Sequence, residues 1–218
     1  MTTFRLVVFD LDGTLIDSRR DLAQSANALL AESGCGPLSE EAIGRMVGDG
    51  AATLVKRAFD AAGCPQPSTA LDRFLAIYNN RLLAFTRPYD GIIDVLAALA
   101  PRTTLALLTN KPLASTRQIL DGLDMSRYFE LSRVIGGDGP FPRKPDPVGL
   151  IHLMHEAAAT PGDTVLVGDS KIDWQTARAA RAHICLARYG FGFDNILAEG
   201  LDELDRVVET PGDLLGFL

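Results

Sequence analysis

The clearest structural signal in the sequence is the segment Phe4-Arg5-Leu6-Val7-Val8-Phe9-Asp10-Leu11-Asp12-Gly13-Thr14-Leu15. An apolar run of β-branched and aromatic residues ends in two carboxylates, Asp10 and Asp12, and then a glycine. A short run that is apolar at nearly every position is typical of a strand buried on both faces of a parallel sheet. Ligands of such sheets bind beyond the carboxyl ends of the strands. We therefore expect Asp10 at the ligand-binding edge of the sheet.

The two carboxylates also carry a prediction about charge. If the strand's period of two continues past its end, the side chains of Asp10 and Asp12 point the same way. Two unpaired carboxylates in a buried position would cost several kcal/mol each. A bound cation is the simplest compensation, because carboxylate oxygens are its preferred ligands.

Composition narrows the class of protein. The chain has 218 residues, 47% hydrophobic and 22% charged, which is ordinary for a globular protein that folds as one large domain or a domain with an insertion. Its net charge of -7 and the lack of a basic cluster argue against a nucleic-acid partner. We see neither a signal-peptide pattern nor an apolar run of membrane-spanning length. The three cysteines are too few and too scattered for a disulfide framework, so we expect reduced thiols in a cytoplasmic protein.

The hydrophobic periodicity divides the chain into a helical insertion and an α/β core. Residues 17–86 read as consecutive amphipathic helices, with the last stripe running from Leu71 to Phe85. This segment is too long for one crossover of a parallel sheet. We expect a Rossmann-like parallel-sheet core, 1–16 and 87–218, with a helical cap domain, 17–86, inserted after the first strand. Further strands are expected at 104–108, 133–135, 164–167, 184–187 and 206–208, and core helices at 92–99, from Pro112, at 146–158, 173–182 and 211–218.

Polar residues gather at or just after the expected strand ends. They are Asp10 and Asp12, Thr109 and Asn110, Lys144, and Asp169 and Asp173. Since parallel strands present their carboxyl ends at one edge, these side chains are expected to share a site. The residue types suit phosphoryl transfer, in which a carboxylate attacks phosphorus and a cation offsets the repulsion between the two anions.

The four clusters resemble the signature of the haloacid dehalogenase-like superfamily. The motifs are Asp10-Leu-Asp-Gly-Thr-Leu, Leu107-Leu-Thr-Asn, Lys144-Pro, and Val167-Gly-Asp-Ser-Lys-Ile-Asp. The resemblance implies that Asp10 is the nucleophile and Asp12 the general acid and base. It implies Mg²⁺ ligation by Asp10, Asp169 and the main-chain carbonyl of Asp12, phosphate binding by Thr109, Asn110 and Lys144, and support of the metal site by Asp173. Asp173 has an alternative role as the cap of the helix that it opens.

A narrower resemblance, carried by Asp12-Gly-Thr-Leu-Ile-Asp-Ser, Val47-Gly-Asp-Gly and Tyr89-Asp-Gly, is to phosphoglycolate phosphatases. It implies a Mg²⁺-dependent phosphatase that hydrolyses a small phosphomonoester, 2-phosphoglycolate, through an aspartyl-phosphate. Two alternatives remain at this point. One is a phosphatase or phosphomutase for a sugar or nucleotide phosphate. The other is a protein that senses phosphate or binds a partner without turnover. The sequence does not distinguish a monomer from a homodimer.

Several residues near the expected site have two interpretations. The segment Gly48-Asp49-Gly50 is either a plain turn or a cap loop that closes over the substrate. Lys111 and Lys171 either attract anions or are solvated surface lysines, and we favour the surface interpretation. Arg143 and Arg188 are treated in the same way. His152, His155 and His183 are expected on helix surfaces or at a helix end, without a catalytic role.

Overall fold

A six-stranded parallel sheet forms the core of the protein within the part of the chain that the computed structural model describes, residues 4–193, 201 and 205–218. Its strand order is β5-β4-β1-β6-β7-β8, so β1 lies between β4 and β6. This confirms the predicted α/β class with a parallel sheet. The strands are β1 (Leu6–Phe9), β4 (Thr104–Leu108), β5 (Val134–Ile135), β6 (Thr164–Gly168), β7 (His183–Ala187) and β8 (Arg206–Val208).

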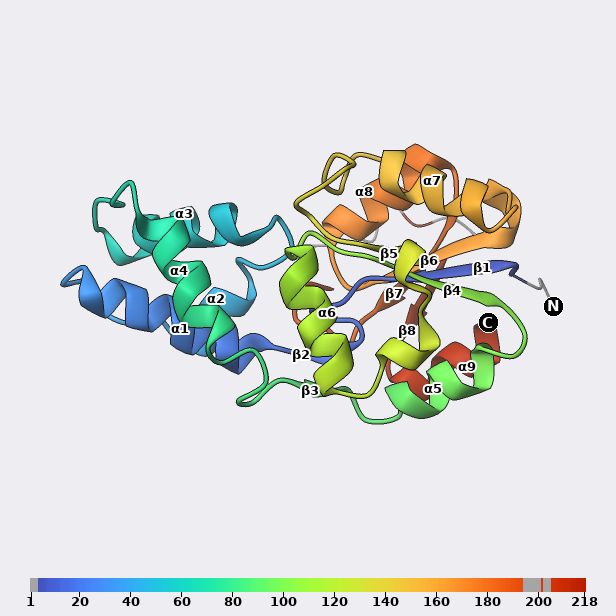
Figure 1. The fold of residues 1–218 in the computed structure, drawn as a ribbon, viewed down its shortest axis with the longest axis horizontal. Helices are drawn as coiled ribbons and strands as arrows, with labels where there is room; N and C mark the ends of the chain where they lie inside the picture. Colours follow the sequence, from blue (N-terminus) through green and yellow to red (C-terminus); the bar gives the residue numbers. More distant parts are fainter. Residues whose placement is uncertain (1–3, 194–200, 202–204) are drawn as a thin grey trace.

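Helices cover both faces of the sheet, as the continuous apolar run of β1 predicts (Figure 1). Val7 and Phe9 point into a core shared with α5 (Ile92–Leu99), α6 (Leu113–Gly122) and α9 (Leu214–Phe217). Leu6 and Val8 point to the opposite face, where they pack with α7 (Val148–Glu156) and α8 (Lys171–Ala180). Short 3₁₀ turns lie at Ser126–Tyr128, Leu131–Arg133, Pro161–Asp163 and Pro211–Asp213.

A group of helices, called the helical body here, stands beside the sheet (Figure 1). It consists of α1 (Arg19–Glu32), α2 (Glu40–Gly44), α3 (Ala51–Ala62) and α4 (Ala70–Asn79). The chain enters it through β2 (Ile16–Asp17) and leaves it through β3 (Arg87–Pro88), and these two short strands pair antiparallel. The buried Asp21 closes this junction, because its Oδ2 accepts hydrogen bonds from the Phe85 N–H and from the Thr86 N–H and hydroxyl.

Some element ends differ from the sequence prediction. The helix expected to run to Phe85 ends at Asn79, where the chain passes into turns: the Arg81 N–H bonds to the Tyr78 carbonyl, three residues back. The N–H groups of Phe85 and Thr86 then bond to Asp21. Pro112 is the N-cap residue rather than a residue of the first turn of α6. The helix expected from Asp173 begins at Lys171, because Ser170 caps it. His183, expected at a helix end, is the first residue of β7.

The prediction of three reduced cysteines is wrong for two of them. Cys35 and Cys64 form a disulfide that joins the segments following α1 and α3, with their Cα atoms 6.3 Å apart. Packing of α1 against α3 brings these two residues together, which their separation of 29 positions does not reveal. Cys185 is free and buried, as expected of an inert core residue.

None of the helices in the described ranges is both long enough and apolar enough to span a bilayer.

Candidate active site

The ends of three neighbouring strands bring the predicted polar residues together. Asp10 follows β1 directly, Thr109 and Asn110 follow β4, and Asp169 follows β6. Because β1 pairs with both β4 and β6, these residues meet at one edge of the sheet. All four are buried. The structure therefore places the clusters at the edge that the sequence predicts.

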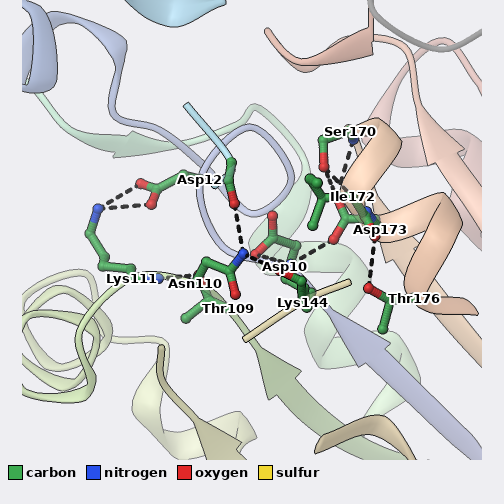
Figure 2. Close-up of polar contacts among 11 residues, drawn as sticks. Asp10, Asp12, Thr109, Asn110, Lys111, Lys144, Ser170, Ile172, Asp173 and Thr176 are labelled. Carbon is green, nitrogen blue, oxygen red and sulfur yellow. Dashed lines mark hydrogen bonds and ion pairs between the residues drawn. The ribbon is translucent and has the colours of Figure 1, made fainter. Parts of the chain in front are cut away.

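Lys144 joins two of the carboxylates by a buried ion pair (Figure 2). It lies in the segment before α7, with its Nζ 2.9 Å from Asp10 Oδ1 and 2.6 Å from Asp173 Oδ1. Burial alone would lower the pKa of Lys144, but the negative charges of Asp10 and Asp173 outweigh burial and raise that pKa above its ordinary value. Lys144 therefore carries its positive charge beside the first carboxylate of the site.

Two of the buried carboxylates resist ionisation. Burial raises the pKa of Asp10 to about 6; the charge of Asp173 adds to this, while Lys144 acts in the opposite direction. Burial, with the charges of Asp173 and Asp10, also raises the pKa of Asp169 well above its usual value. The site consequently holds more acidic groups than its own lysine neutralises, which favours a bound cation.

The donor set fits a hard divalent cation. One carboxylate oxygen from each of Asp10, Asp169 and Asp173 lies within 4.8 Å of the others. Asp10 Oδ1 is buried and forms an ion pair with the Lys144 ammonium at 2.9 Å. A buried group of three carboxylates with one lysine is the chemistry that Mg²⁺ selects. The sequence predicted a set of Asp10, Asp169 and the main-chain carbonyl of Asp12; the side-chain cluster contains Asp10 and Asp169 and adds Asp173.

Asp173 caps α8, which is one of the two roles that the sequence offered, and it also binds Lys144. Its Oδ2 accepts hydrogen bonds from the N–H and hydroxyl of Ser170 in a capping box, which confirms it as a cap of α8. Its Oδ1 accepts a hydrogen bond from Lys144 at 2.6 Å. With both oxygens engaged, Asp173 fixes the position of Lys144 and the start of α8 at the same time.

Gly13 allows the first loop to approach the acidic group closely. Its φ of +85° lies in the left-handed region, and a Cβ atom there would stand 2.0 Å from Asp169 Oδ2. No side chain could be accommodated at that position without displacing Asp169. The glycine after the two aspartates is thus explained by close approach as well as by backbone conformation.

Asp12 does not point the same way as Asp10, contrary to the prediction (Figure 2). Strand β1 ends at Phe9, so the alternation of side chains does not extend to Asp12. Both of its carboxylate oxygens accept hydrogen bonds from Lys111 Nζ, at 2.9 and 2.8 Å, and Oδ1 also accepts one from the Ser18 hydroxyl at 2.5 Å. Asp10 and Asp12 therefore form ion pairs with different lysines, Lys144 and Lys111.

The burial of Lys111 is a second correction. It was expected at the solvated surface, but its side chain is only 4% exposed and its ammonium lies 4.7 Å from the centre of the Tyr78 ring. The available signal was its position directly after Thr109 and Asn110 at a strand end. Lys171 and Arg188 are exposed, as the surface interpretation predicts, and Arg188 pairs with Glu209.

Asn110 ties the helical body to the core. Its Nδ2 donates hydrogen bonds to the carbonyls of Gly48 and Lys144, both at 2.9 Å. Gly48 and Gly50 line the site, whereas Asp49 pairs with Arg57 of α3 at 2.6 Å and is absent from the lining residues. The loop predicted as a plain turn or a cap loop thus contacts the core at the site through its glycines.

A cavity of about 50 Å³ lies between the sheet edge and the helical body. Its polar lining comprises Asp10, Asp12, Thr109, Asn110, Lys111 and Tyr78. The helical body contributes mainly apolar walls from Leu22, Val47, Ala51, Leu54, Phe74 and Leu75. Sequence reasoning had not found Tyr78, which periodicity marks only as an apolar position of its helix.

This arrangement matches a known family over most of the chain. The model of haloacid dehalogenase-like hydrolases matches residues 7–187. The chain belongs to the haloacid dehalogenase-like hydrolase family. The family resemblance read from the four clusters is thereby confirmed.

Relatives of this hydrolase agree in sequence and in fold. Phosphoglycolate phosphatase from Rhodospirillum rubrum is 38% identical over 222 residues, which cover 98% of this chain and 91% of the relative. Phosphoglycolate phosphatase 1 from Pseudomonas aeruginosa is 37% identical over 218 residues, covering 97% and 78%. The crystal structure of a predicted phosphoglycolate phosphatase from Haemophilus somnus 129pt has a TM-score of 0.89 at 29% identity, covering 99% of this hydrolase and 98% of that chain.

Proposed function

We propose that this hydrolase releases inorganic phosphate from a small phosphomonoester, 2-phosphoglycolate, through an aspartyl-phosphate on Asp10. The observation that carries the proposal is the placement of the Asp10 carboxylate at the end of β1, in one cavity with Asp12, Thr109 and Asn110 and in contact with Lys144. The names of the relatives from R. rubrum and P. aeruginosa support 2-phosphoglycolate as the substrate.

In the first half of the reaction, the polar residues of the site bind the phosphoryl group and transfer it to Asp10. A carboxylate oxygen of Asp10 forms a bond to phosphorus while the bond between phosphorus and the glycolate oxygen breaks. The leaving oxygen takes its proton from Asp12. Lys144, the Thr109 hydroxyl and the Asn110 segment hold the phosphoryl oxygens. Lys144 is suited to this task because it is already charged and fixed between Asp10 and Asp173.

The second half regenerates the carboxylate. Asp12, now ionised, accepts a proton from a water molecule whose oxygen attacks phosphorus. The bond between Asp10 and phosphorus breaks, and inorganic phosphate leaves. The Ser18 hydroxyl and Lys111, both bonded to Asp12, keep its carboxylate oriented through both halves.

Mg²⁺ is the proposed cofactor, held by Asp10, Asp169 and the main-chain carbonyl of Asp12, with Asp173 beside them. When bound, it supplies positive charge that lets an anionic carboxylate meet an anionic phosphate. The raised pKa values of Asp10 and Asp169 support this assignment, since they report an excess of buried acid at this point.

We propose further that residues 17–86 are a cap domain over a core of residues 1–16 and 87–218. Closure would exclude bulk water from the aspartyl-phosphate, and opening would release glycolate. The hydrogen bond from Asn110 to the Gly48 carbonyl supports this, because it joins the helical body to the core at the cavity.

The test is phosphate release from a panel of esters with and without Mg²⁺. The panel contains 2-phosphoglycolate, sugar phosphates and nucleoside monophosphates. We expect Mg²⁺-dependent release with 2-phosphoglycolate preferred, and we expect Asp10→Asn to abolish it while leaving thermal unfolding nearly unchanged. Folded protein that releases no phosphate from any ester would overturn the proposal, and a preferred sugar phosphate would overturn the substrate.

A further inference from the structure

The cavity extends from Asp10 to side chains of the helical body, and neither Lys144 nor Asp169 is among its lining residues. If the phosphoryl group lies against Asp10 as proposed above, the remainder of the substrate must occupy this part of the cavity. Its walls are apolar side chains of the helical body, interrupted by Lys111 and Tyr78. Among the described residues that line the cavity, Lys111 is the only cation.

Lys111 has more capacity to donate than Asp12 uses. Its ammonium is buried in an ion pair with Asp12, 2.8 Å away. An ammonium carries three N–H donors, and two of them suffice for the bonds to the two oxygens of Asp12. Burying a lysine is costly, and orienting Asp12 alone would not require one, because the Ser18 hydroxyl already bonds to that carboxylate. The third N–H is therefore left for Tyr78, whose ring centre lies 4.7 Å from the ammonium, and for a ligand that binds beside it.

Tyr78 supplies a second, independent sign of a ligand. The residue is 3% exposed, and its hydroxyl is buried with no hydrogen-bond partner among the described residues. A buried hydroxyl without a partner is destabilising, and a bound acceptor would remove that cost. Since Tyr78 lines the cavity and its ring lies against the Lys111 ammonium, the two donors serve one small volume.

We infer that Lys111 and Tyr78 form a subsite for a carboxylate on the leaving group, and that this subsite selects phosphorylated 2-hydroxy acids over phosphate esters whose leaving group carries no charge. Two donors facing one small cavity call for a ligand group that only accepts hydrogen bonds, as a carboxylate does. The inference rests on the proposed position of the phosphoryl group at Asp10. In this arrangement Lys111 and Tyr78 recognise the carboxylate of the substrate, while other residues carry out the reaction.

The test compares 2-phosphoglycolate with 2-phosphoglycolamide and ethyl phosphate, which keep the phosphate but lack the carboxylate. The measured quantity is the ratio of kcat/KM for 2-phosphoglycolate to kcat/KM for each ester that lacks the carboxylate. Lys111→Met is expected to lower this ratio about 10- to 100-fold and Tyr78→Phe several-fold, because each variant loses one donor to the carboxylate. Tyr78 makes no hydrogen bond to Asp12, so Tyr78→Phe tests the subsite without disturbing that residue. Lys171→Met, an exposed lysine with the same substitution, is the matched control and should leave the ratio unchanged.

A ratio that is the same in wild type, Lys111→Met and Tyr78→Phe would overturn the subsite and leave Lys111 as a positioning residue for Asp12. Binding separates this failure from a failure of the proposed function. Calorimetric titration of 2-phosphoglycolate and ethyl phosphate into Asp10→Asn protein needs no turnover. A preference for the acid that disappears in Asp10→Asn/Lys111→Met supports the subsite even if the wild type releases no phosphate, whereas a preference that persists contradicts it.

Discussion

Replacing Lys144 by Met tests the electrostatic balance of the site most sharply. The substitution keeps most of the side-chain length and removes the charge. It leaves Asp10 and Asp173, whose side chains are 7% and 0% exposed, without the cation that lies 2.9 and 2.6 Å away. Breaking a buried ion pair by removing one partner costs about 3–5 kcal/mol. For a chain of this size, each kcal/mol corresponds to about 2–4 °C, so we expect Tm to fall by about 6–20 °C at neutral pH.

The pKa of Asp10 determines how the stability loss of Lys144→Met depends on pH. The pKa of Asp10 is about 6 with Lys144 present, and loss of the lysine raises it further. A carboxyl group with a raised folded-state pKa contributes stability that is present at low pH and lost as pH rises through that pKa. The deficit of Lys144→Met relative to wild type should therefore be larger at about pH 7.5 than at about pH 5.

The assay is calorimetric unfolding in EDTA at both pH values, with Lys171→Met as the exposed control. A double variant, Lys144→Met/Asp173→Asn, removes one charge of each sign and should regain part of the lost stability, since the amide introduced by Asp173→Asn retains an oxygen that can accept from Ser170. If Lys144→Met melts within about 2 °C of wild type at neutral pH, the buried ion pair does not have the energetic role assigned to it.

Three further predictions concern the metal, the disulfide and the junction. Mg²⁺ should raise Tm more at about pH 7.5 than at about pH 5, because the raised pKa values of Asp10 and Asp169 make protons compete with the ion at low pH; an equal shift would contradict this. Reduction of Cys35–Cys64 should lower the free energy of unfolding by about 3–4 kcal/mol in urea titrations, and oxidised protein unfolded without reductant should show one of its three cysteines as a free thiol rather than all three. Asp21→Ala should cost about 2–4 kcal/mol in the same titrations because three donors lose their buried acceptor; a loss below about 1 kcal/mol would refute its role at the junction.

Sequence reasoning succeeded where one local pattern determines the outcome. The unbroken apolar run of Leu6–Phe9 can be satisfied only by burial on both faces, and this predicts the centre of a parallel sheet. Once the sheet is parallel, topology alone brings Asp10, Thr109 and Asp169 to one edge. The residues flanking each strand therefore carried most of the candidate site.

It failed where tertiary packing decides between two local possibilities. A lysine at the position of Lys111 is solvated or buried depending on what covers it. The helical body places Tyr78 over Lys111. Asp12 follows the loop that begins after Phe9 and not the alternation of the strand. The Cys35–Cys64 bond depends on how α1 packs with α3, and the path of the chain at Phe85 depends on Asp21, many positions away in sequence.

The central claim is that the carboxylate of Asp10 takes the phosphoryl group. The most direct measurement is mass spectrometry of wild-type protein quenched rapidly in acid during turnover of 2-phosphoglycolate with Mg²⁺, because both formation and hydrolysis of the intermediate require Asp12 and the wild type keeps it. We expect one phosphoryl group on the peptide containing residues 4–15, located at Asp10 and absent from Asp10→Asn protein. Phosphate released by Asp10→Asn protein, or a phosphoryl group found on any other residue, would contradict it.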